Sequence, residues 1–298
     1  MKIFLTGKNG QLGSRLEHDL KKIHDVIAMD RETLDLRDVE LIKDKTLQVK
    51  PNLIINAAAY NYVDLAEKEK KLARQINSLA PKVLSDLAKE LDIPIIHIST
   101  DYIFDGSKKS SYEEDDEAGP LSVYGKTKWE GEEFVRQNPK HFILRTSWVF
   151  STYGHNFLKT IIKLAQEKTS LNVIDDQWGA PTSVRTLSEA IQAIIHKLQE
   201  QKHIDTYGTY HVASDNETNW YLYARKILDV LESFKVQLKL KKNNIYPIAS
   251  SQYPQDAKRP KNSRMNTTKF KNTFMVEFPS WENEVKDTVV QLIKELNK

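Results

Sequence analysis

The chain has 298 residues, of which 40% are hydrophobic and 29% charged, with a formal net charge of +3 and no cysteine. This composition is that of an ordinary globular protein, and it excludes disulfides, thiolate catalysis and cysteine-based zinc sites. The basic residues are spread along the chain and no apolar run approaches the ~20 residues of a membrane span. We therefore expect a cytoplasmic protein without a nucleic-acid or membrane partner.

Residues 2–6 predict a short buried strand that runs directly into a glycine-rich turn. Gly7, Gly10 and Gly13 permit a tight turn and close backbone approach, and a pyrophosphate can then lie on the N-terminus of the helix that follows. The turn therefore predicts a dinucleotide site that also includes Gln11 and Leu12. A purely structural turn is the alternative.

The second predicted strand, 25–29, ends at Asp30. In dinucleotide-binding folds an acid about 20 residues past the glycines hydrogen-bonds the adenosine ribose. Arg31 follows directly and could instead hold a 2′-phosphate, so both NADH and NADPH stay open as the cofactor. Asp38 is expected to cap the next helix or to contact the adenine.

The third predicted strand, 52–56, is followed by small residues that would let a flat cofactor lie against the backbone, or that simply pack closely. The cofactor-facing residues expected here are Ala57, Ala58, Ala59 and Tyr60. A helix is expected over 66–91, and the fourth strand, 95–98, leads to Thr100. This alternation predicts a Rossmann-like α/β fold with a doubly wound parallel sheet, which binds ligands beyond the carboxyl ends of its strands.

Tyr124 and Lys128 are four residues apart, which places both side chains on one face of a helix. A cation beside a phenol favours the phenolate, and lowering a tyrosine pKa from about 10 to about 7 takes roughly 4 kcal/mol. The spacing alone arises by accident in a lysine-rich chain. The predicted convergence of this helix with Gly10, Ala58 and Thr100 favours a catalytic pair.

After Trp148 the regular alternation loosens, and we expect two domains. Residues 1–150 would bind the dinucleotide, and 151–298 would form a smaller α/β substrate domain, with a segment near 186–215 returning to the main sheet. The acidic loop 106–119 is interpreted as solvated surface. His97 and His211 lie in apolar strands and are interpreted as core residues.

Several segments of the chain resemble the extended short-chain dehydrogenase/reductases, and within them the dTDP-4-dehydrorhamnose reductase family, nearly end to end. The resemblance rests on segments that begin at Gly7, Asn56, Ser99, Tyr124, Arg145, Asp176 and Arg259 and read GKNGQLG, NAAAY, STDYIF, YGKTK, RTSWVF, DQWGAPT and RPKNSR. The glycine and Tyr–Lys motifs are shared by the whole superfamily, whereas the STDY, DQxGxPT and RPxNS segments are much more specific to this family.

The resemblance implies reduction of a 4-keto sugar that is bound through its nucleotide, with NADH or NADPH as cofactor and dTDP-4-dehydro-L-rhamnose as substrate. It implies that Tyr124 protonates the alkoxide, that Lys128 stabilises the phenolate and binds the nicotinamide ribose, and that Thr100 donates to the carbonyl oxygen. The substrate-binding residues that it implies are Thr100, Asp101, Tyr102, Trp148, Arg259, Asn262 and Ser263. Trp148 could instead be core packing, Arg259 a surface turn, and Gln177 and Thr182 domain architecture.

Two departures from the family pattern bear on the prediction. Asn61 stands where relatives often have a small hydroxyl residue, and Arg15 stands where some relatives use an acid in a metal-assisted dimer contact. A cation repels a cation, so no metal is expected, and a monomer and a homodimer both stay open. An epimerase or dehydratase on this scaffold, or a non-catalytic regulatory subunit like that of methionine adenosyltransferase, are the alternative functions.

Overall fold

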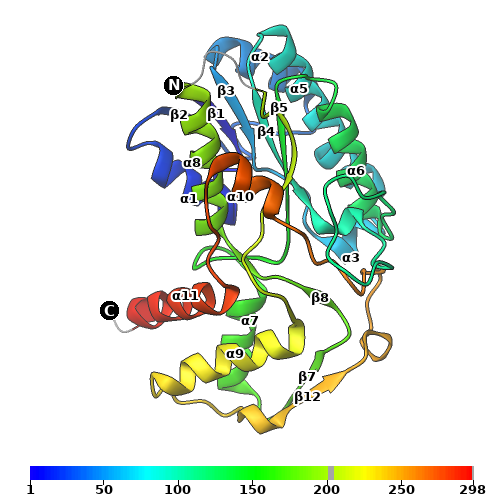
Figure 1. Ribbon diagram of the computed structural model, residues 1–298, viewed down its shortest axis with the longest axis vertical. Coiled ribbons are helices and arrows are strands. Elements are labelled where there is room, and N and C mark those ends of the chain that lie inside the picture. Colours follow the sequence, from blue (N-terminus) through cyan, green and yellow to red (C-terminus); the bar gives the residue numbers. More distant parts are fainter. Residues whose placement is uncertain (201–204, 297–298) are drawn as a thin grey trace.

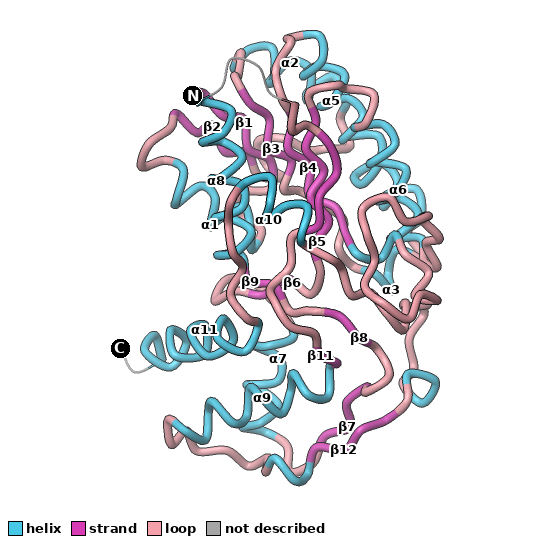
Figure 2. The backbone as a smooth tube through the Cα atoms, in the orientation of Figure 1, coloured by secondary structure: helices cyan, strands magenta, loops and turns pink. Residues whose placement is uncertain are grey.

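The computed structural model describes residues 1–200 and 205–296, and its centre is a six-stranded parallel sheet in the order β10-β5-β4-β3-β1-β2 (Figures 1 and 2). The strands are β1 (Lys2–Thr6), β2 (Asp25–Met29), β3 (Leu53–Asn56), β4 (Ile95–Thr100), β5 (His141–Thr146) and β10 (Gly208–His211). The strand order reverses between β1 and β3, as in a doubly wound fold, so the predicted fold class is confirmed.

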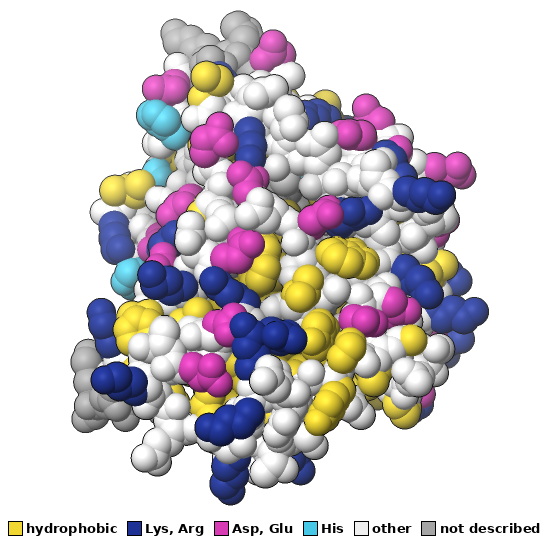
Figure 3. Space-filling view, turned by 60° about the horizontal axis from the view of Figure 1, so that its bottom comes forward, with side chains coloured by type: hydrophobic (Ala, Val, Ile, Leu, Met, Phe, Trp, Pro, Cys, Tyr) yellow, Lys and Arg dark blue, Asp and Glu magenta, His cyan; other side chains and the backbone are white. Residues whose placement is uncertain are grey.

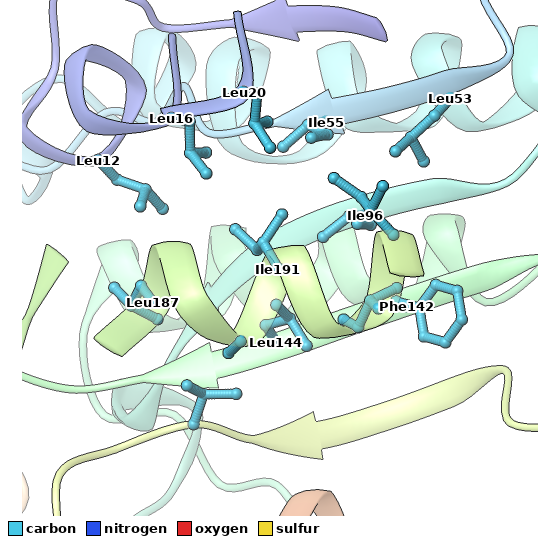
Figure 4. Close-up of a cluster of buried hydrophobic side chains, with 14 of the residues drawn as sticks. Leu12, Leu16, Leu20, Leu53, Ile55, Ile96, Phe142, Leu144, Leu187 and Ile191 are labelled. Carbon is cyan, nitrogen blue, oxygen red and sulfur yellow. The ribbon is translucent and has the colours of Figure 1, made fainter. Parts of the chain in front are cut away.

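Helices cover both faces of this sheet because its strands are apolar on both sides. One face packs against α1 (Gln11–Leu20) and α8 (Val184–Glu200), with α10 (Thr268–Phe274) beside β10. Figure 4 shows Leu12, Leu16 and Leu20 on this face, with side chains of α8 nearby. The other face packs against α2 (Val39–Val49), α5 (Ala80–Glu90) and α6 (Val123–Val135).

The long helix predicted over 66–91 is interrupted. The chain forms α3 (Val63–Ala66), α4 (Lys70–Arg74), a π-helical turn η1 (Gln75–Leu79) and then α5. In η1, Asn77 is buried and bonds the backbone of Tyr60 on both sides, accepting from its amide at 2.8 Å and donating to its carbonyl at 3.1 Å. This long-range pairing accompanies the wider turn, a feature that is frequent at functional sites.

A second group of helices packs around a separate apolar core, below the sheet in Figure 1. It comprises α7 (Phe157–Glu167), α9 (Trp220–Ser233) and α11 (Trp281–Leu296). Short strand pairs accompany these helices: β6 (Val149–Phe150) with β9 (Thr182–Ser183), β7 (Leu171–Ile174) with β12 (Ile245–Ile248), and β8 (Trp178–Gly179) with β11 (Thr218–Asn219). Short 3-10 turns are η2 (Asp101–Ile103), η3 (Lys242–Asn244) and η4 (Ser250–Gln252). No helix within residues 1–200 and 205–296 is long and apolar enough to cross a membrane.

Strand β10 lies at the edge of the main sheet beside β5, although it comes well after residue 150. His97 on β4 and His211 on β10 are fully buried, as predicted for core histidines. The boundary near residue 150 stays a prediction.

The acidic loop 106–119 is not wholly solvated, which corrects the interpretation from its composition. Tyr112 stacks on Phe104 with ring centroids 4.1 Å apart. The Glu114 carboxylate is buried and accepts a hydrogen bond from the backbone amide of His211 at 3.0 Å. The loop is therefore anchored to the edge strand β10 by a buried acid.

Candidate functional site

The start of α6 places Tyr124 against the carboxyl end of β4. The Ser122 side chain caps the helix by accepting from the Gly125 amide at 3.1 Å. Gly125 packs directly on the backbone of Tyr102, and a Cβ at this position would lie 2.3 Å from the Tyr102 carbonyl oxygen. The absence of a side chain at Gly125 therefore lets the helix approach η2 closely.

The Tyr124 side chain is buried next to Thr100 and Tyr102. Its ring meets the Tyr102 ring edge-on with centroids 5.9 Å apart, and its hydroxyl donates to Oδ1 of Asn61 at 3.5 Å. Burial raises the pKa of Tyr124 above its usual value, and the Thr100 hydroxyl offsets only part of that rise. The structure thus corrects the expectation of a lowered pKa, because burial outweighs any cationic neighbour.

Lys128 is buried one turn after Tyr124, but its ammonium is engaged with the sheet. Nζ donates to the carbonyl oxygen of Ile98 at 2.6 Å. Burial lowers the pKa of Lys128 to about 8, although the nearby Glu132 carboxylate acts in the opposite direction. The pair shares one helix face as predicted, but Lys128 is not among the groups that shift the pKa of Tyr124.

Thr100 and Asp101 form a buried polar pair at the end of β4. Thr100 caps η2 by accepting from the Tyr102 amide at 3.2 Å, and its hydroxyl lies 3.0 Å from Oδ1 of Asp101. Burial raises the pKa of Asp101 to about 7. A hydroxyl, a carboxyl and the Tyr124 phenol thus lie together where a carbonyl substrate would need hydrogen-bond donors.

The glycine turn has the shape that a dinucleotide requires. Gly7 has φ +79° and lies so close to Ala58 that a Cβ would come within 2.9 Å of the Ala58 backbone, while a Cβ on Gly13 would lie 2.0 Å from the Gly7 carbonyl oxygen. Gly10 caps α1 without any side-chain hydrogen bond, and the first turn of α1 carries no acid. A backbone-lined helix N-terminus of this kind fits a pyrophosphate.

Gln11 and Leu12 use their side chains for packing and for a contact between the two helical groups. Oε1 of Gln11 accepts from Ser151 Oγ and from Asn156 Nδ2, each at 2.9 Å. Leu12 is part of the core between the sheet and α8. A cofactor contact of either residue would therefore run through its backbone.

Asp30 and Arg31 lie at the end of β2 and do not decide between NADH and NADPH. Asp30 is 3.0 Å from Lys8 and accepts from the Thr33 amide at 2.9 Å, and these contacts hold the pKa of its carboxyl well below its usual range. Arg31 is exposed. Asp38 caps α2 by accepting from the Leu41 amide at 3.0 Å, so the capping alternative is confirmed.

The segment after β3 is held in place by a residue that the sequence reasoning missed. Ala57, Ala58 and Ala59 are half-buried, and Tyr60 is buried with its hydroxyl 2.7 Å from Glu69. Asn77 joins Tyr60 to α6, since its Nδ2 also lies 3.2 Å from Thr127 Oγ1. Asn77 is an amide in an otherwise apolar helical pattern, and this was the feature of the sequence that could have indicated its role.

Trp148 lies between β5 and β6 and has a left-handed backbone conformation, φ +46°. Its ring stacks on Trp220 at 3.7 Å and 15°, and Trp220 Nε1 donates to Gln177 at 3.2 Å. Gly179 makes room for the ring, because a Cβ there would be 2.9 Å from the indole. Trp148 therefore packs against the apolar core around α9, as the core-packing alternative expected, and its contact with a substrate stays a prediction.

Arg259 lines a cavity of about 350 Å³ between the two helical groups. Its guanidinium binds Asp64, and the cavity is also lined by Trp220 and Gln177. Figure 3 shows hydrophobic side chains in a band across one face, bordered by Lys and Arg.

Asn262 and Ser263 follow Arg259 and are largely used within the protein. Asn262 donates to the carbonyls of Lys108 and Ser110, and it accepts from the backbone amide and the guanidinium of Arg264. Ser263 Oγ donates to the Trp178 carbonyl at 3.3 Å and lies close enough to Asp101 to lower its pKa. A nucleotide contact by Asn262 stays a prediction, and it would have to replace one of these bonds.

The sequence matches a known family over almost its whole length. Residues 1–294 match the family model of the RmlD substrate binding domain. A dTDP-4-dehydrorhamnose reductase of Sinorhizobium fredii is 36% identical, with 99% of each chain covered. The enzyme of the same name from Salmonella typhimurium is 37% identical, with 98% of each chain covered.

Solved structures agree with the sequence comparison. A dTDP-4-dehydrorhamnose reductase from Clostridium acetobutylicum superposes with a TM-score of 0.90 at 36% identity, covering 98% of this chain and 99% of that one. The Bacillus anthracis protein of that name, crystallised with NADP, has a TM-score of 0.88 at 32% identity, covering 97% and 99%. A UDP-galactose 4-epimerase at 20% identity shares the fold, with a TM-score of 0.79.

Proposed function

Since this chain belongs to the RmlD substrate binding domain family, we propose that it reduces the 4-keto group of dTDP-4-dehydro-L-rhamnose to dTDP-L-rhamnose with NADPH or NADH. The observation that carries the proposal is the grouping of Tyr124, Lys128 and Thr100 at the carboxyl edge of the sheet, the same edge that carries the glycine turn after β1.

The glycine turn and the N-terminus of α1 would hold the pyrophosphate of the cofactor. When bound, a reduced nicotinamide supplies a hydride. Gly7, Gly10 and Gly13 offer backbone rather than side chains at this position, and Asp30, whose lowered pKa keeps it ionised at the end of β2, would bind the adenosine ribose. Lys8 already neutralises Asp30, so a 2′-phosphate would meet Lys8 and Arg31 there.

Tyr124 is the proposed proton donor. Its raised pKa keeps the phenol protonated at neutral pH, which is the state that a general acid needs for reduction of a ketone. Thr100 would donate to the carbonyl oxygen, and Lys128 would exchange its bond to the Ile98 carbonyl for one to the ribose. Burial of all three side chains strengthens these interactions because water is excluded.

The sugar nucleotide would occupy the cavity lined by Gln177, Trp220 and Arg259. About 350 Å³ lies within the usual range for small-molecule sites. A planar guanidinium suits the diphosphate, and an indole offers an apolar face to a sugar or a base. We place Asp101, Tyr102 and Ser263 on the sugar side.

The test is consumption of reduced cofactor in the presence of dTDP-4-dehydro-L-rhamnose, followed by the loss of near-ultraviolet absorbance. Tyr124→Phe should lower kcat by about 10²–10⁴-fold while leaving cofactor binding intact by thermal shift. Tyr112→Phe is the matched control, because Tyr112 lies in the acidic loop and its hydroxyl bonds Asp105 just before that loop. No oxidation of either cofactor, or an undiminished rate in Tyr124→Phe, would contradict the proposal.

We also propose that the chain divides near residue 150 into a dinucleotide-binding part and a substrate part, and that it works in the cytoplasm as a monomer or homodimer. NAD that stayed bound through purification would favour an epimerase or dehydratase. Co-purification with a larger partner, without reductase activity, would favour a regulatory subunit.

A further inference from the structure

Whenever Asp101 is ionised, the Thr100 hydroxyl donates its proton in a hydrogen bond to the Asp101 carboxylate. Oγ1 of Thr100 lies 3.0 Å from Oδ1 of Asp101 and accepts from the Tyr102 amide at 3.2 Å. An ionised carboxylate can only accept, so Thr100 must then be the donor. In this state Thr100 has no proton to offer to a substrate carbonyl.

The surroundings of Asp101 disfavour its charged form. The residue is 2% exposed, and within the described parts of the chain Oδ2 has no hydrogen-bond partner. A buried carboxylate oxygen without a donor is costly. The pKa of Asp101 is raised to about 7 by burial, against the smaller effects of the Ser263 and Thr100 hydroxyls and of the backbone amides of Asp101 and Tyr102.

The titratable groups that face Asp101 do not stabilise its ionised form. On its own turn η2 Tyr102 is half-buried, and on α6 Tyr124 is buried; desolvation raises the pKa of both phenols above the usual value. The Arg259 guanidinium lies next to Tyr102 but is paired with Asp64. Lys128 on α6 is engaged with the Ile98 carbonyl.

We propose that Asp101 is a positioning residue that, when neutral, donates to Thr100 and so turns the Thr100 hydroxyl toward the substrate carbonyl. The Tyr102 amide and the Asp101 proton fill the two lone pairs of Oγ1, which leaves the Thr100 proton free. This proton then points to the space beside the Tyr124 hydroxyl, where the carbonyl oxygen must receive its proton. The inference rests on the proposed reductase function.

The test compares the pH profiles of kcat/KM in wild type and Asp101→Asn, which keeps the shape and offers a permanent donor to Thr100. The wild-type value should be constant below pH 7 and fall about tenfold per pH unit above it, since the neutral acid is required. In D101N this fall should disappear until the Tyr124 phenol itself ionises. Glu114→Gln is the matched control, because it neutralises another buried acid outside the site and should keep the wild-type profile.

A second measurement does not depend on activity. Infrared spectra of the cofactor-free protein should contain a protonated-carboxyl band at pH 6 that titrates near pH 7, is absent from D101N and persists in E114Q. If D101N does not fold, Asp101→Glu moves the same carboxyl by one methylene and should shift the midpoint of both measurements.

The outcomes separate this inference from the function on which it rests. Absence of turnover in wild type at every pH overturns the proposed function. An active wild type whose kcat/KM is flat from pH 6 to 9, or a D101N variant that keeps the fall near pH 7, overturns the role of Asp101 alone. If the protonated-carboxyl band disappears in E114Q but not in D101N, the role of Asp101 is likewise overturned.

Discussion

Asp64 on α3 binds Arg259 through two hydrogen bonds of 3.1 and 2.6 Å, although 195 residues separate the two side chains in sequence. The same carboxylate accepts from the Ala257 amide at 3.0 Å. Beside this contact Lys68 lies 2.6 Å from Asp256. The segment before Arg259 is thereby fixed to the sheet side of the cavity, and the guanidinium is oriented by a bidentate partner.

Asp64→Asn should raise KM for the sugar nucleotide about tenfold with little change in kcat, since a neutral amide cannot hold the guanidinium bidentately. Stability should fall by less than about 1 kcal/mol, because the Asp64 carboxylate is partly exposed. Steady-state kinetics and urea unfolding measure the two effects.

The matched control for Asp64 is Lys68→Ala, which removes the neighbouring, more exposed pair and should change KM by less than threefold or so. Arg259 lowers the pKa of Asp64, so the stabilisation is present above the ordinary pKa of about 4 and is lost as the pH falls through the folded value. An unchanged KM in D64N would show that Arg259 needs no such partner.

Local patterns predicted the sheet well. β1 and β2 begin and end at the predicted residues, because each is an apolar run that ends at a glycine turn or an acid. The glycines, the cap at Asp38 and the start of α6 at Ser122 are likewise decided by neighbours in sequence. Such features depend on short-range backbone chemistry.

Features decided by distant residues were not predictable. The π-helical turn accompanies the bonds between Asn77 and Tyr60, and the buried Glu114 bonds the edge strand β10. The raised pKa of Tyr124 required knowledge of its burial, whereas its spacing from Lys128 indicated the opposite shift. The spacing of two residues in the sequence shows whether their side chains share a helix face, but it does not show how deeply those side chains are buried.

Lys128→Met should make the cofactor-free protein more stable at pH 7 while abolishing most activity. Burial lowers the pKa of Lys128 from 10.5 to about 8, which corresponds to up to roughly 3 kcal/mol against the charged form. Loss of the bond to the Ile98 carbonyl costs about 1 kcal/mol, so the free energy of unfolding should rise by about 1–2 kcal/mol in urea unfolding.

The pH dependence of that gain has a definite sign. Below pH 8 the lysine is charged in both states and folding must bury the charge, so methionine is favoured; above pH 10.5 both states are neutral and the advantage disappears. Lys126→Met, at an exposed position of the same helix, should show neither effect. A K128M protein that is less stable at pH 7 would show that the ammonium is solvated.

Arg145→Met should destabilise the protein by up to about 3–5 kcal/mol, because the buried Glu132 then loses one of its two cationic partners and keeps only the more exposed Arg136. The guanidinium and the carboxylate lie 2.9 Å apart, and both side chains are almost fully buried. Arg74→Met is the control, since its pair with Glu130 is exposed and should cost less than about 1 kcal/mol. Equal losses in urea unfolding would contradict the buried-charge explanation.

Gly13→Ala should displace the glycine turn. The added Cβ would lie 2.0 Å from the Gly7 carbonyl oxygen and 2.9 Å from the Lys8 Cα, both of them backbone atoms that cannot rotate away. Overpacking of this kind costs about 1–3 kcal/mol, and the cofactor site loses its shape, so the thermal shift with NADPH should disappear. Gly10→Ala is the graded comparison, because its nearest contact would be 3.2 Å and its unfolding free energy should change by less than about 1 kcal/mol. If the two variants are equally stable and G13A still binds NADPH, the close approach of α1 to the turn is not what shapes the site.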